Sequence, residues 1–303
     1  MKILITGGAG FIGHNLAIYL NNSGFDIIVL DSLERSTDFA LKRLNEAGIP
    51  LARASIMKLD EIKSLFKGVD AVVHAAAYVD VAESVGKPLV YLEKNVLGTA
   101  SVAKASLETG VDLLIYLSSA AVYGNPSKLP IGENHPTQPV SPYGLSKLMG
   151  EEVVRFFSTY GFKQVVLRLF NVYGPGQNAA YAGVITKFLE RVRNSLPPII
   201  YGDGEQTRDF IHVEDVAEAV RLVLKTGCVG ETLNIGSGIP TRIKDLAYLV
   251  MRVFEVSGEP VYTNDRQGDI KHSYADISKA RSLLGFEPRI SLEQGLRKIL
   301  EQQ

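Results

Sequence analysis

A glycine-rich segment near the start of the chain constrains the fold more than any other feature. The apolar run Lys2–Thr6 leads directly into Gly7, Gly10 and Gly13, and a helical pattern follows. Glycines at this spacing allow a tight turn from strand to helix, let a pyrophosphate approach the backbone and let the helix pack closely on the strand. The helix N-terminus adds backbone amides and a positive dipole. The segment therefore predicts a strand, turn and helix that bind a dinucleotide.

Short β-branched runs alternate with helix-length segments through the first half of the chain. Strands are predicted at residues 2–6, 26–30, 71–74, 113–117 and 164–170. Helices are predicted at residues 12–22, 88–109 and 142–160, the last with Ser141 as N-cap and Pro142 at its first position. Because the strands read as buried on both faces, they favour an α/β fold, a doubly wound parallel sheet of the Rossmann type.

Turn residues become frequent after Asn171, which indicates a second, smaller C-terminal α/β lobe that would hold the substrate. A strongly amphipathic helix over residues 213–225 suggests that the chain returns to the first lobe. We therefore expect a dinucleotide-binding Rossmann domain over residues 1–171 plus about 206–226. The substrate lobe is expected over residues 172–205 and 227–303.

Composition narrows the class of partner. The 303 residues carry 32 basic and 33 acidic side chains, a formal net charge of −1, which gives no basis for capture of nucleic acid or of a membrane surface. No run reaches the ~18 apolar residues of a membrane span. A single cysteine, Cys228, forms no intramolecular disulfide and no Cys/His metal pattern. We expect a cytoplasmic protein with a small-molecule partner and no metal site.

Asp31 indicates which dinucleotide binds. It lies eighteen residues after Gly13, at the end of the second predicted strand, where a carboxylate accepts hydrogen bonds from ribose hydroxyls. The same carboxylate would repel a 2′-phosphate, so NAD is favoured over NADP. Arg35 lies four residues further on and could reach a phosphate, which leaves NADP as the alternative.

Tyr143 and Lys147 lie at positions i and i+4 of a predicted helix and therefore project from one face. A phenol needs its pKa lowered by ~3 units, about 4 kcal/mol, to act as a base near neutrality, and a neighbouring ammonium favours that change. Ser118 and Ser119 follow the strand at residues 113–117, at the end where parallel sheets contact ligands. The pair pattern alone is commonly structural, and such serines also satisfy strand-end backbone groups. Together they favour a catalytic set of Ser119, Tyr143 and Lys147.

These motifs and several others resemble the nucleotide-sugar epimerase/dehydratase family of extended short-chain dehydrogenases/reductases. The resemblance spans nearly the whole chain. Its carriers are residues 7–13, 74–77, Asn95, 118–124, 143–147, 168–171, 208–212 and 234–236. It implies NAD-dependent 4-epimerisation of a UDP-hexose through a transient 4-keto sugar, with UDP-glucose, UDP-galactose and N-acetylated forms as candidate substrates. The predicted helices 88–109 and 142–160 match those that pair in dimers of this family, which implies a homodimer.

The resemblance also implies a role for each residue of the site. Tyr143 would be the general base, Lys147 would hold the nicotinamide ribose and lower the tyrosine pKa, and Ser119 would bridge Tyr143 and the sugar 4-hydroxyl. Expected cofactor contacts are Gly7, Gly10, Phe11, Ile12, Gly13, Asp31, Ser32, Ser55, Ile56, Ala75, Ala76, Ala77, Asn95, Ser118, Tyr143, Lys147 and Phe170. Expected contacts with the UDP-sugar are Ser119, Asn171, Val184, Arg208, Arg266 and Asp269. Both arginines could instead form surface ion pairs.

Five positions depart from the family pattern or refine it. Ser55 replaces an Asp that contacts adenine, Val79 replaces a cofactor-contacting lysine, and Ala121 replaces a hydroxyl residue. Ala120 and Ala121 lack the acid pair that 4,6-dehydratases use, which counts against dehydration. A small Ser273 would leave room for an N-acetyl group.

Three alternatives stay open from the sequence. Within the family, the chain could be a UDP-uronate epimerase or decarboxylase, or an NADPH-linked reductase. From another class, it could be an NAD-sensing binding protein, against which the intact set Ser119, Tyr143 and Lys147 argues. His74 and His212 are candidate acid/base groups, but each lies in or after an apolar run, so we expect both to be structural.

Overall fold

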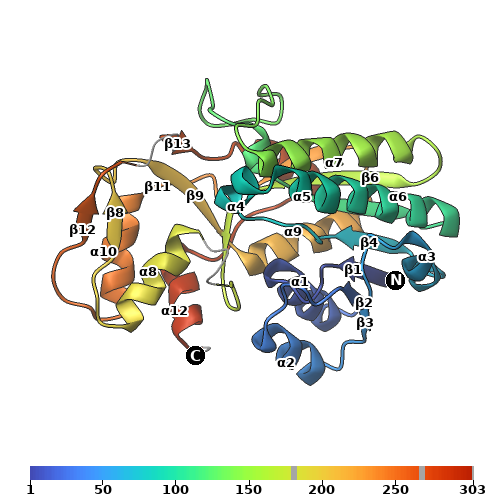
Figure 1. The fold of residues 1–303 in the computed structure, drawn as a ribbon, viewed down its shortest axis with the longest axis horizontal. Helices are drawn as coiled ribbons and strands as arrows, with labels where there is room; N and C mark the ends of the chain where they lie inside the picture. The colour runs from blue at the N-terminus through green and yellow to red at the C-terminus, as the bar shows by residue number, and fades with distance from the viewer. Residues whose placement is uncertain (179–182, 266–269, 302–303) are drawn as a thin grey trace.

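The structure, a computed structural model, describes residues 1–178, 183–265 and 270–301. Within these ranges the centre is a seven-stranded sheet of order β10-β6-β5-β4-β1-β2-β3, and its neighbouring strands are parallel (Figure 1). The strands are β1 (Lys2–Thr6), β2 (Asp26–Asp31), β3 (Leu51–Arg53), β4 (Ala71–His74), β5 (Leu113–Ser119), β6 (Lys163–Leu169) and β10 (Thr232–Ile235). The expected doubly wound α/β fold is confirmed.

Two hydrophobic cores cover the two faces of this sheet. Successive strand residues point to opposite faces, so Ile3 and Ile5 belong to one core and Leu4 to the other. The first core includes side chains from α1 (Phe11–Asn22), α2 (Asp38–Glu46), α9 (Val213–Thr226) and α11 (Ser278–Leu284). The second includes side chains from α3 (Leu59–Lys63), η1 (Ser64–Phe66), α6 (Gly98–Thr109) and α7 (Pro142–Ser158). Burial on both faces explains why the strands read as continuous apolar runs.

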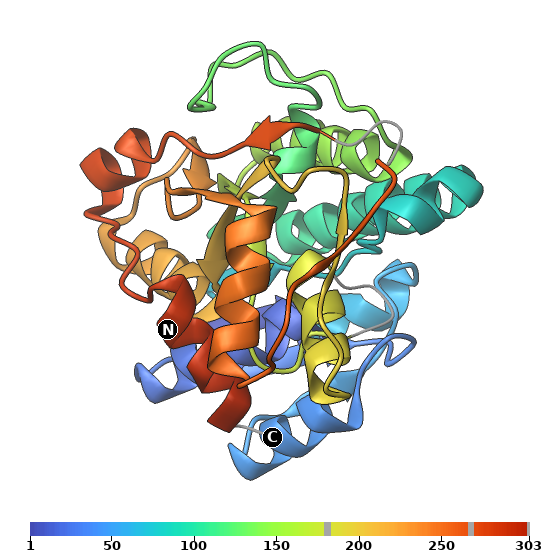
Figure 2. The same cartoon turned by 90° about the vertical axis from the view of Figure 1, so that its left-hand side faces the viewer.

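A smaller lobe lies beside the carboxyl ends of the sheet (Figures 1 and 2). Strands β7 (Asn171–Tyr173), β9 (Thr207–His212), β11 (Pro240–Arg242) and β13 (His272–Ser273) form a second sheet, and β8 (Ile199–Tyr201) pairs with β12 (Val261–Thr263). Its helices α8 (Val184–Arg193), α10 (Ile243–Val253) and α12 (Leu292–Glu301) enclose a core of their own. We refer to these elements as the smaller lobe.

The observed elements refine the expected boundaries. The predicted helix at residues 88–109 consists of α5 (Pro88–Leu92), a π-helical turn η2 (Glu93–Leu97) and α6. Helix α7 begins after Ser141, whose Oγ accepts a hydrogen bond from the backbone of Gly144 at 3.1 Å, with Pro142 in its first turn, as expected. The sequence places residues 227–303 in the substrate lobe. Within this range, however, β10 extends the large sheet beside β6, and α11 packs on the large sheet. The exact division into lobes stays a prediction.

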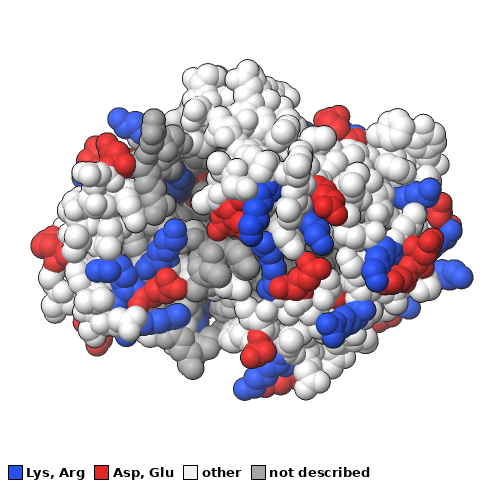
Figure 3. All heavy atoms as spheres, viewed as in Figure 1, with Lys and Arg blue, Asp and Glu red and all other residues white. Residues whose placement is uncertain are grey.

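In the part of the chain that the structure describes, none of the helices is long and apolar enough to cross a membrane. In the same ranges, no three His, Cys, Asp or Glu side chains are grouped as a metal ion would require. On the face drawn in Figure 3, basic and acidic side chains are interspersed, which is consistent with the balanced composition.

Helix α7 lies against β5 at a glycine. A Cβ at Gly150 would lie 2.1 Å from Oη and 2.7 Å from Cζ of Tyr116, a fully buried ring on β5. We expect Gly150→Ala to lower the free energy of unfolding by about 1–3 kcal/mol, because the helix must shift and overpacking outweighs the better helix propensity of alanine. Urea denaturation measures the change.

The matched control is Gly86→Ala at the end of α4 (Val81–Gly86), where a Cβ would meet nothing within 4 Å. This variant should unfold within about 1 kcal/mol of the original protein. Equal stability of the two variants would contradict the close approach of α7 to Tyr116.

Candidate active site

A cleft of about 1090 Å³ runs between the carboxyl ends of the large sheet and the smaller lobe. Gly10, Asp31 and Tyr143 line it from the large sheet and its helices, and Arg208 and Ser273 line it from the smaller lobe. This edge of a parallel sheet is where open α/β folds bind their ligands. The cleft therefore brings the predicted cofactor and substrate residues into one continuous space.

The glycine turn forms a backbone cradle at one end of this cleft. Gly7 has φ +68°, and a Cβ there would lie 2.5 Å from Cα of Ala76. A Cβ at Gly13 would lie 2.2 Å from the carbonyl oxygen of Gly7. Helix α1 follows Gly10, which provides no side-chain cap, and its first turn contains no acidic residue. Amides of this first turn are thus available to an anionic group, as the sequence predicted.

Asp31 is held at the end of β2 by backbone amides. Its Oδ2 accepts from Ala9 N at 3.0 Å, and its Oδ1 accepts from Leu33 N at 2.8 Å. Burial raises the pKa of Asp31, and these two hydrogen bonds oppose that change. Ser32, Ser55 and Ile56 line the cleft nearby. The carboxylate lies beside the glycine turn, in the position that the ribose-binding prediction requires.

Arg35 borders the cleft, but other side chains hold its guanidinium. Its Nη2 donates to both carboxylate oxygens of Glu83, at 3.0 and 2.8 Å, and its guanidinium lies 3.6 Å from the ring centroid of Tyr78. Burial raises the pKa of Glu83, but hydrogen bonds from Arg35, Tyr91 and Lys87 outweigh it and hold the value at about 2. Arg35 is therefore engaged by a residue 48 positions away, which weakens the NADP alternative.

The three predicted catalytic residues meet where β5 and α7 approach each other. Ser119 ends β5, and Tyr143 lies in the first turn of α7, hydrogen-bonded to Ser119. Burial raises the pKa of Tyr143, and the hydrogen bond with Ser119 lowers it. Lys147 is buried, with Nζ 4.8 Å from the ring centroid of Tyr116. Burial lowers the pKa of Lys147 to about 8, although attraction to Glu151 raises it.

Two predicted cofactor contacts, Asn95 and Ser118, have hydrogen-bond partners within the protein, and their contact with the cofactor stays a prediction. Asn95 does not line the cleft, because its buried side chain accepts from Tyr78 N at 2.7 Å and donates to Tyr78 O at 2.9 Å and Ser146 Oγ at 2.8 Å. It therefore holds the backbone of Tyr78 in place. Ser118 borders the cleft, but its hydroxyl donates to Glu151 Oε1 at 2.5 Å.

Most of the other predicted residues line the cleft. These are Phe11, Ile12, Ala75, Ala77 and Phe170 on the cofactor side and Asn171, Val184 and Arg208 on the substrate side. Arg208 donates to the backbone oxygen of Thr207 at 2.9 Å. Arg266 and Asp269 lie outside the described residues.

His74 and His212, which were expected to be structural, have hydrogen-bond partners within the fold. His74 is buried on β4, with Nδ1 2.7 Å from Thr6 Oγ1 and Nε2 2.9 Å from Thr99 Oγ1. His212 caps α9, since its Nδ1 accepts from Glu214 N at 3.3 Å. Neither histidine lines the cleft.

Helix α8 contributes more of the cleft than Val184, the one residue of this helix that the sequence predicted. Lys187 and Arg191, four residues apart on this helix, both border the cleft. Their i, i+4 spacing was the available signal, but an exposed basic pair on a helix is usually a solvated face.

Comparison with known proteins decides the family. The model of the "NAD dependent epimerase/dehydratase family" matches residues 3–236. The chain belongs to this family. A curated relative from Methanocaldococcus jannaschii is 39% identical over 301 residues, which cover 98% of this chain and 97% of the relative.

Two solved structures are similar over almost their whole length. A UDP-glucose 4-epimerase from Thermotoga maritima, solved with UDP-glucose, is 36% identical with a TM-score of 0.93, and the match covers 99% of this chain and 98% of that one. A UDP-N-acetylglucosamine 4-epimerase from Methanobrevibacter ruminantium, solved with UDP-N-acetylmuramic acid, is 32% identical with a TM-score of 0.92, covering 100% and 99%. Members of the epimerase/dehydratase family that share this fold thus differ in their sugar.

The cofactor of this epimerase/dehydratase family member is NAD. The residues of the cleft fit it. The turn at Gly7 and Gly13 keeps a cradle that any Cβ would fill, and the uncapped first turn of α1 offers amides to a pyrophosphate. Asp31 offers a carboxylate to ribose hydroxyls, whereas Arg35 is paired with Glu83.

This pairing predicts a change in cofactor preference. Glu83→Ala removes the carboxylate that holds Arg35, so the guanidinium becomes available to a 2′-phosphate. We expect the ratio of the NADP to the NAD dissociation constant to fall about tenfold, as one charge-assisted hydrogen bond would give. Calorimetric titration of cofactor-stripped protein with each dinucleotide measures this ratio.

The matched control is Lys87→Ala, which removes an exposed partner of Glu83 and keeps the Arg35 pair. An unchanged ratio in Glu83→Ala would show that Arg35 does not reach the 2′ position.

Proposed function

We propose that this protein catalyses NAD-dependent 4-epimerisation of a UDP-hexose, interconverting UDP-glucose and UDP-galactose through a transient 4-keto sugar. The observation that carries the proposal is the meeting of Ser119, Tyr143 and Lys147 at the carboxyl end of β5, in the same cleft as the glycine turn. This arrangement supports the proposal because Tyr143, the proposed proton acceptor, and the glycine turn border one continuous space. Its membership of the epimerase/dehydratase family and its similarity to UDP-hexose 4-epimerases support the same reaction.

Each residue has a chemical task in the proposed reaction. When bound, NAD supplies the ring that takes up a hydride from C4 of the sugar and returns it to the other face. Tyr143 accepts the proton of the 4-hydroxyl, and Ser119 holds that hydroxyl against the phenol. Burial raises the pKa of Tyr143, so without help little of its phenolate form, which is the base, is present near neutral pH. The buried Lys147, one turn along α7 from Tyr143, provides the positive charge that favours the phenolate.

The smaller lobe provides the grip on the UDP group in this proposal. Asn171, Val184 and Arg208 border the cleft from β7, α8 and β9. A guanidinium suits a diphosphate because it donates to two oxygens at once. Arg266 and Asp269 remain predicted substrate contacts on the sequence resemblance alone.

Three small side chains in the cleft bear on the type of reaction and on the sugar that is accepted. Ala120 and Ala121 follow Ser119 and provide no acid to protonate a leaving hydroxyl, which favours epimerisation over dehydration. Ser273 borders the cleft from β13, and its small side chain supports acceptance of N-acetylated UDP-hexoses as well.

We also propose that the protein works in the cytoplasm, since its one cysteine, Cys228, suits a reducing compartment.

Conversion of a UDP-hexose without added cofactor tests the function. The purified protein, incubated with UDP-galactose, should produce the anomeric proton signal of UDP-glucose by NMR, and UDP-N-acetylgalactosamine should be converted as well. Tyr143→Phe keeps the shape of the ring and should slow turnover at least ~10²-fold. Tyr248→Phe, an exposed tyrosine on α10, should turn over normally. No product from any UDP-hexose, even with added NAD, would refute the proposal.

We propose in addition that the protein is a homodimer joined along α7. Leu145, Met149 and Phe156 lie on one side of this helix by their spacing, and each is at least 40% exposed. On the neighbouring segments α5 and η2, Leu89 and Leu97 are 77% and 57% exposed. Such a contiguous apolar face is typical of a protein interface, and a second copy of the same face would cover it by twofold symmetry.

Sedimentation velocity tests the dimer. The original protein should sediment as a dimer at micromolar concentration, and Phe156→Glu should give a folded monomer, because a charge would enter the apolar contact. Leu300→Glu, an exposed leucine on α12, serves as the control and should stay dimeric. A monomeric original protein would refute the proposal.

A further inference from the structure

A buried carboxylate lies directly behind the catalytic residues, and the proposed reaction gives it no task. Glu151 follows Lys147 by one turn of α7, and it is fully buried. It does not border the cleft, so it touches neither the cofactor site nor the substrate site. An ionised group in such a place is costly unless it is paired and hydrogen-bonded.

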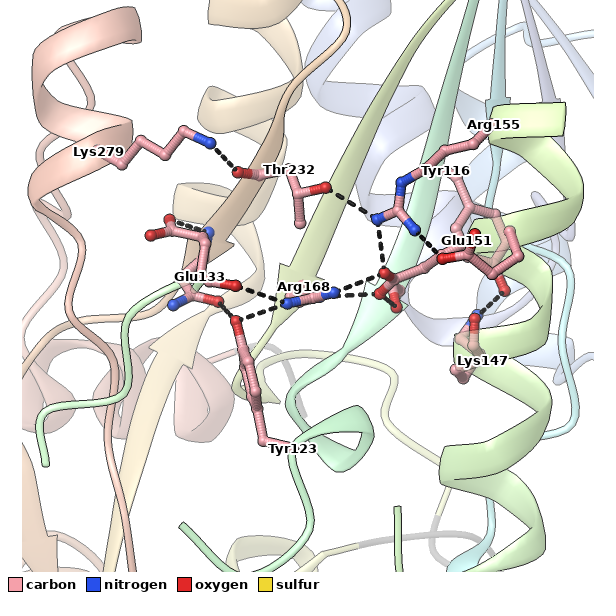
Figure 4. A network of polar contacts seen from close by, with 12 residues as sticks. Tyr116, Tyr123, Glu133, Lys147, Glu151, Arg155, Arg168, Thr232 and Lys279 are labelled. Carbon is pink, nitrogen blue, oxygen red and sulfur yellow. Dashed lines mark hydrogen bonds and ion pairs between the residues drawn. The ribbon is translucent and has the colours of Figure 1, made fainter. Parts of the chain in front are cut away.

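Glu151 meets this condition through contacts with three elements (Figure 4). Arg168 on β6 donates Nε to Oε1 at 2.9 Å and Nη2 to Oε2 at 2.7 Å. Ser118 on β5 donates Oγ to Oε1 at 2.5 Å, and Arg155 on α7 donates Nη2 to Oε2 at 2.8 Å. Although burial raises the pKa of Glu151, the hydrogen bonds from Arg168 and Ser118 outweigh it and lower the value. The group is therefore a carboxylate at neutral pH.

Arg168 is itself fixed on its far side. Its Nη1 donates to Tyr123 Oη at 3.1 Å and to the backbone oxygen of Glu133 at 3.2 Å, and Tyr123 Oη donates to Asn234 Oδ1 at 2.6 Å. In Figure 4, Glu151 lies between Arg168 and the turn of α7 that carries Lys147. The carboxylate is thus anchored to the sheet through Arg168 and Ser118.

Two neighbours of Glu151 matter for the reaction, namely Ser118, which adjoins the catalytic set, and Lys147, which belongs to it. Ser118 precedes Ser119 on β5, so a bond from Ser118 to α7 fixes the strand end relative to the helix that carries Tyr143. Lys147 lies one turn away on the same helix and is attracted by the carboxylate. We propose that Glu151 is a positioning residue of the active site, which locks the end of β5 to α7 and supplies the buried anion that keeps the Lys147 ammonium charged.

The groups that face Lys147 support this assignment. Tyr116 on β5 presents its ring to the ammonium, His74 on β4 is held neutral because burial lowers its pKa to about 3, and Tyr143 is neutral because burial raises its pKa. Of the described titratable groups that act on Lys147, Glu151 is the one that raises its pKa. Without that anion, burial alone would drive the amine toward its neutral form.

The inference rests on the proposed roles of Ser119, Tyr143 and Lys147, and its consequences can be measured separately from them. In Glu151→Gln, the pKa of Lys147 should fall from about 8 by one unit or more, because an opposite charge is removed. The alkaline limb of kcat should then move to lower pH by a similar amount. KM for the UDP-hexose should change less than about threefold, since Glu151 does not border the cleft.

Side-chain ¹⁵N NMR of lysine-labelled, cofactor-stripped protein reports the titration of Lys147 without any substrate, and the signal that disappears in Lys147→Arg assigns it. Glu151→Gln leaves Arg168 buried without its anion and could unfold. The double variant Glu151→Gln/Arg168→Met removes both charges, and it should show the same direction of shift in a folded protein. The matched control, Glu152→Gln, changes the exposed neighbour that also pairs with Arg155 and should leave both titrations unchanged.

The outcomes separate the two proposals. An unchanged Lys147 titration and kcat profile in a folded Glu151 variant would overturn the positioning role and leave the carboxylate as a structural ion pair only. A shifted NMR titration in a protein that converts no UDP-hexose would support the positioning role and refute the proposed function. A rise in KM with an unchanged kcat profile would also overturn it, because a group outside the cleft should act on turnover.

Discussion

The strand-to-helix turn at Gly7–Gly13 is the constraint on which the rest of the site depends. The backbone of Gly7 and that of Ala76 approach so closely that a Cβ would overlap, and Gly13 lies against the carbonyl of Gly7 in the same way. This contact sets β1 and β4 side by side with their carboxyl ends open and aims the first turn of α1 into the cleft. Cofactor site, strand ends and catalytic helix can share one cleft because no side chain fills the turn.

The proposed catalytic residues depend on an equally close contact at α7. Gly150 brings this helix onto the ring of Tyr116, and Gly144 brings its first turn within reach of the backbone of Ala121. Because neither glycine has a side chain, α7 can lie close to β5, and Tyr143 comes to lie beside Ser119. Helix α7 also carries the exposed apolar face, so one helix provides both the proposed catalytic residues and the proposed dimer contact.

Much of this organisation could be predicted from the sequence, because it rests on local patterns. Short local patterns predict the glycine turn, the cap of α7 and five strands of the large sheet, β1, β2, β4, β5 and β6, and the structure confirms them. Strands β3 and β10 were not predicted. The positions of Arg35 and Glu151 could not be predicted, since each is fixed by a partner from a distant segment. The hydrogen bond of Asn95 with the backbone of Tyr78 could not be predicted either, because Asn95 lies in a π-helical turn, which periodicity does not reveal.

The range after residue 227 shows the same limit at the level of the fold. A short strand such as β10 carries no signal for the sheet that it joins, and its register with β6 is set by tertiary packing against α11. The chain therefore crosses between the lobes more often than turn-rich composition suggests.

Burial shapes the electrostatics of the whole catalytic centre in one direction. It raises the pKa of Tyr143, lowers that of Lys147 and lowers that of His74, so in the protein alone each group is driven toward its neutral form. A base needs the opposite, namely a charged ammonium beside a phenol that gives up its proton. Glu151 opposes the trend from behind the cleft, where solvent and substrate cannot screen it. Because the anion lies behind the cleft, it adds no further negative charge to the lining that a diphosphate would meet, and it still acts on Lys147 through the low-dielectric interior.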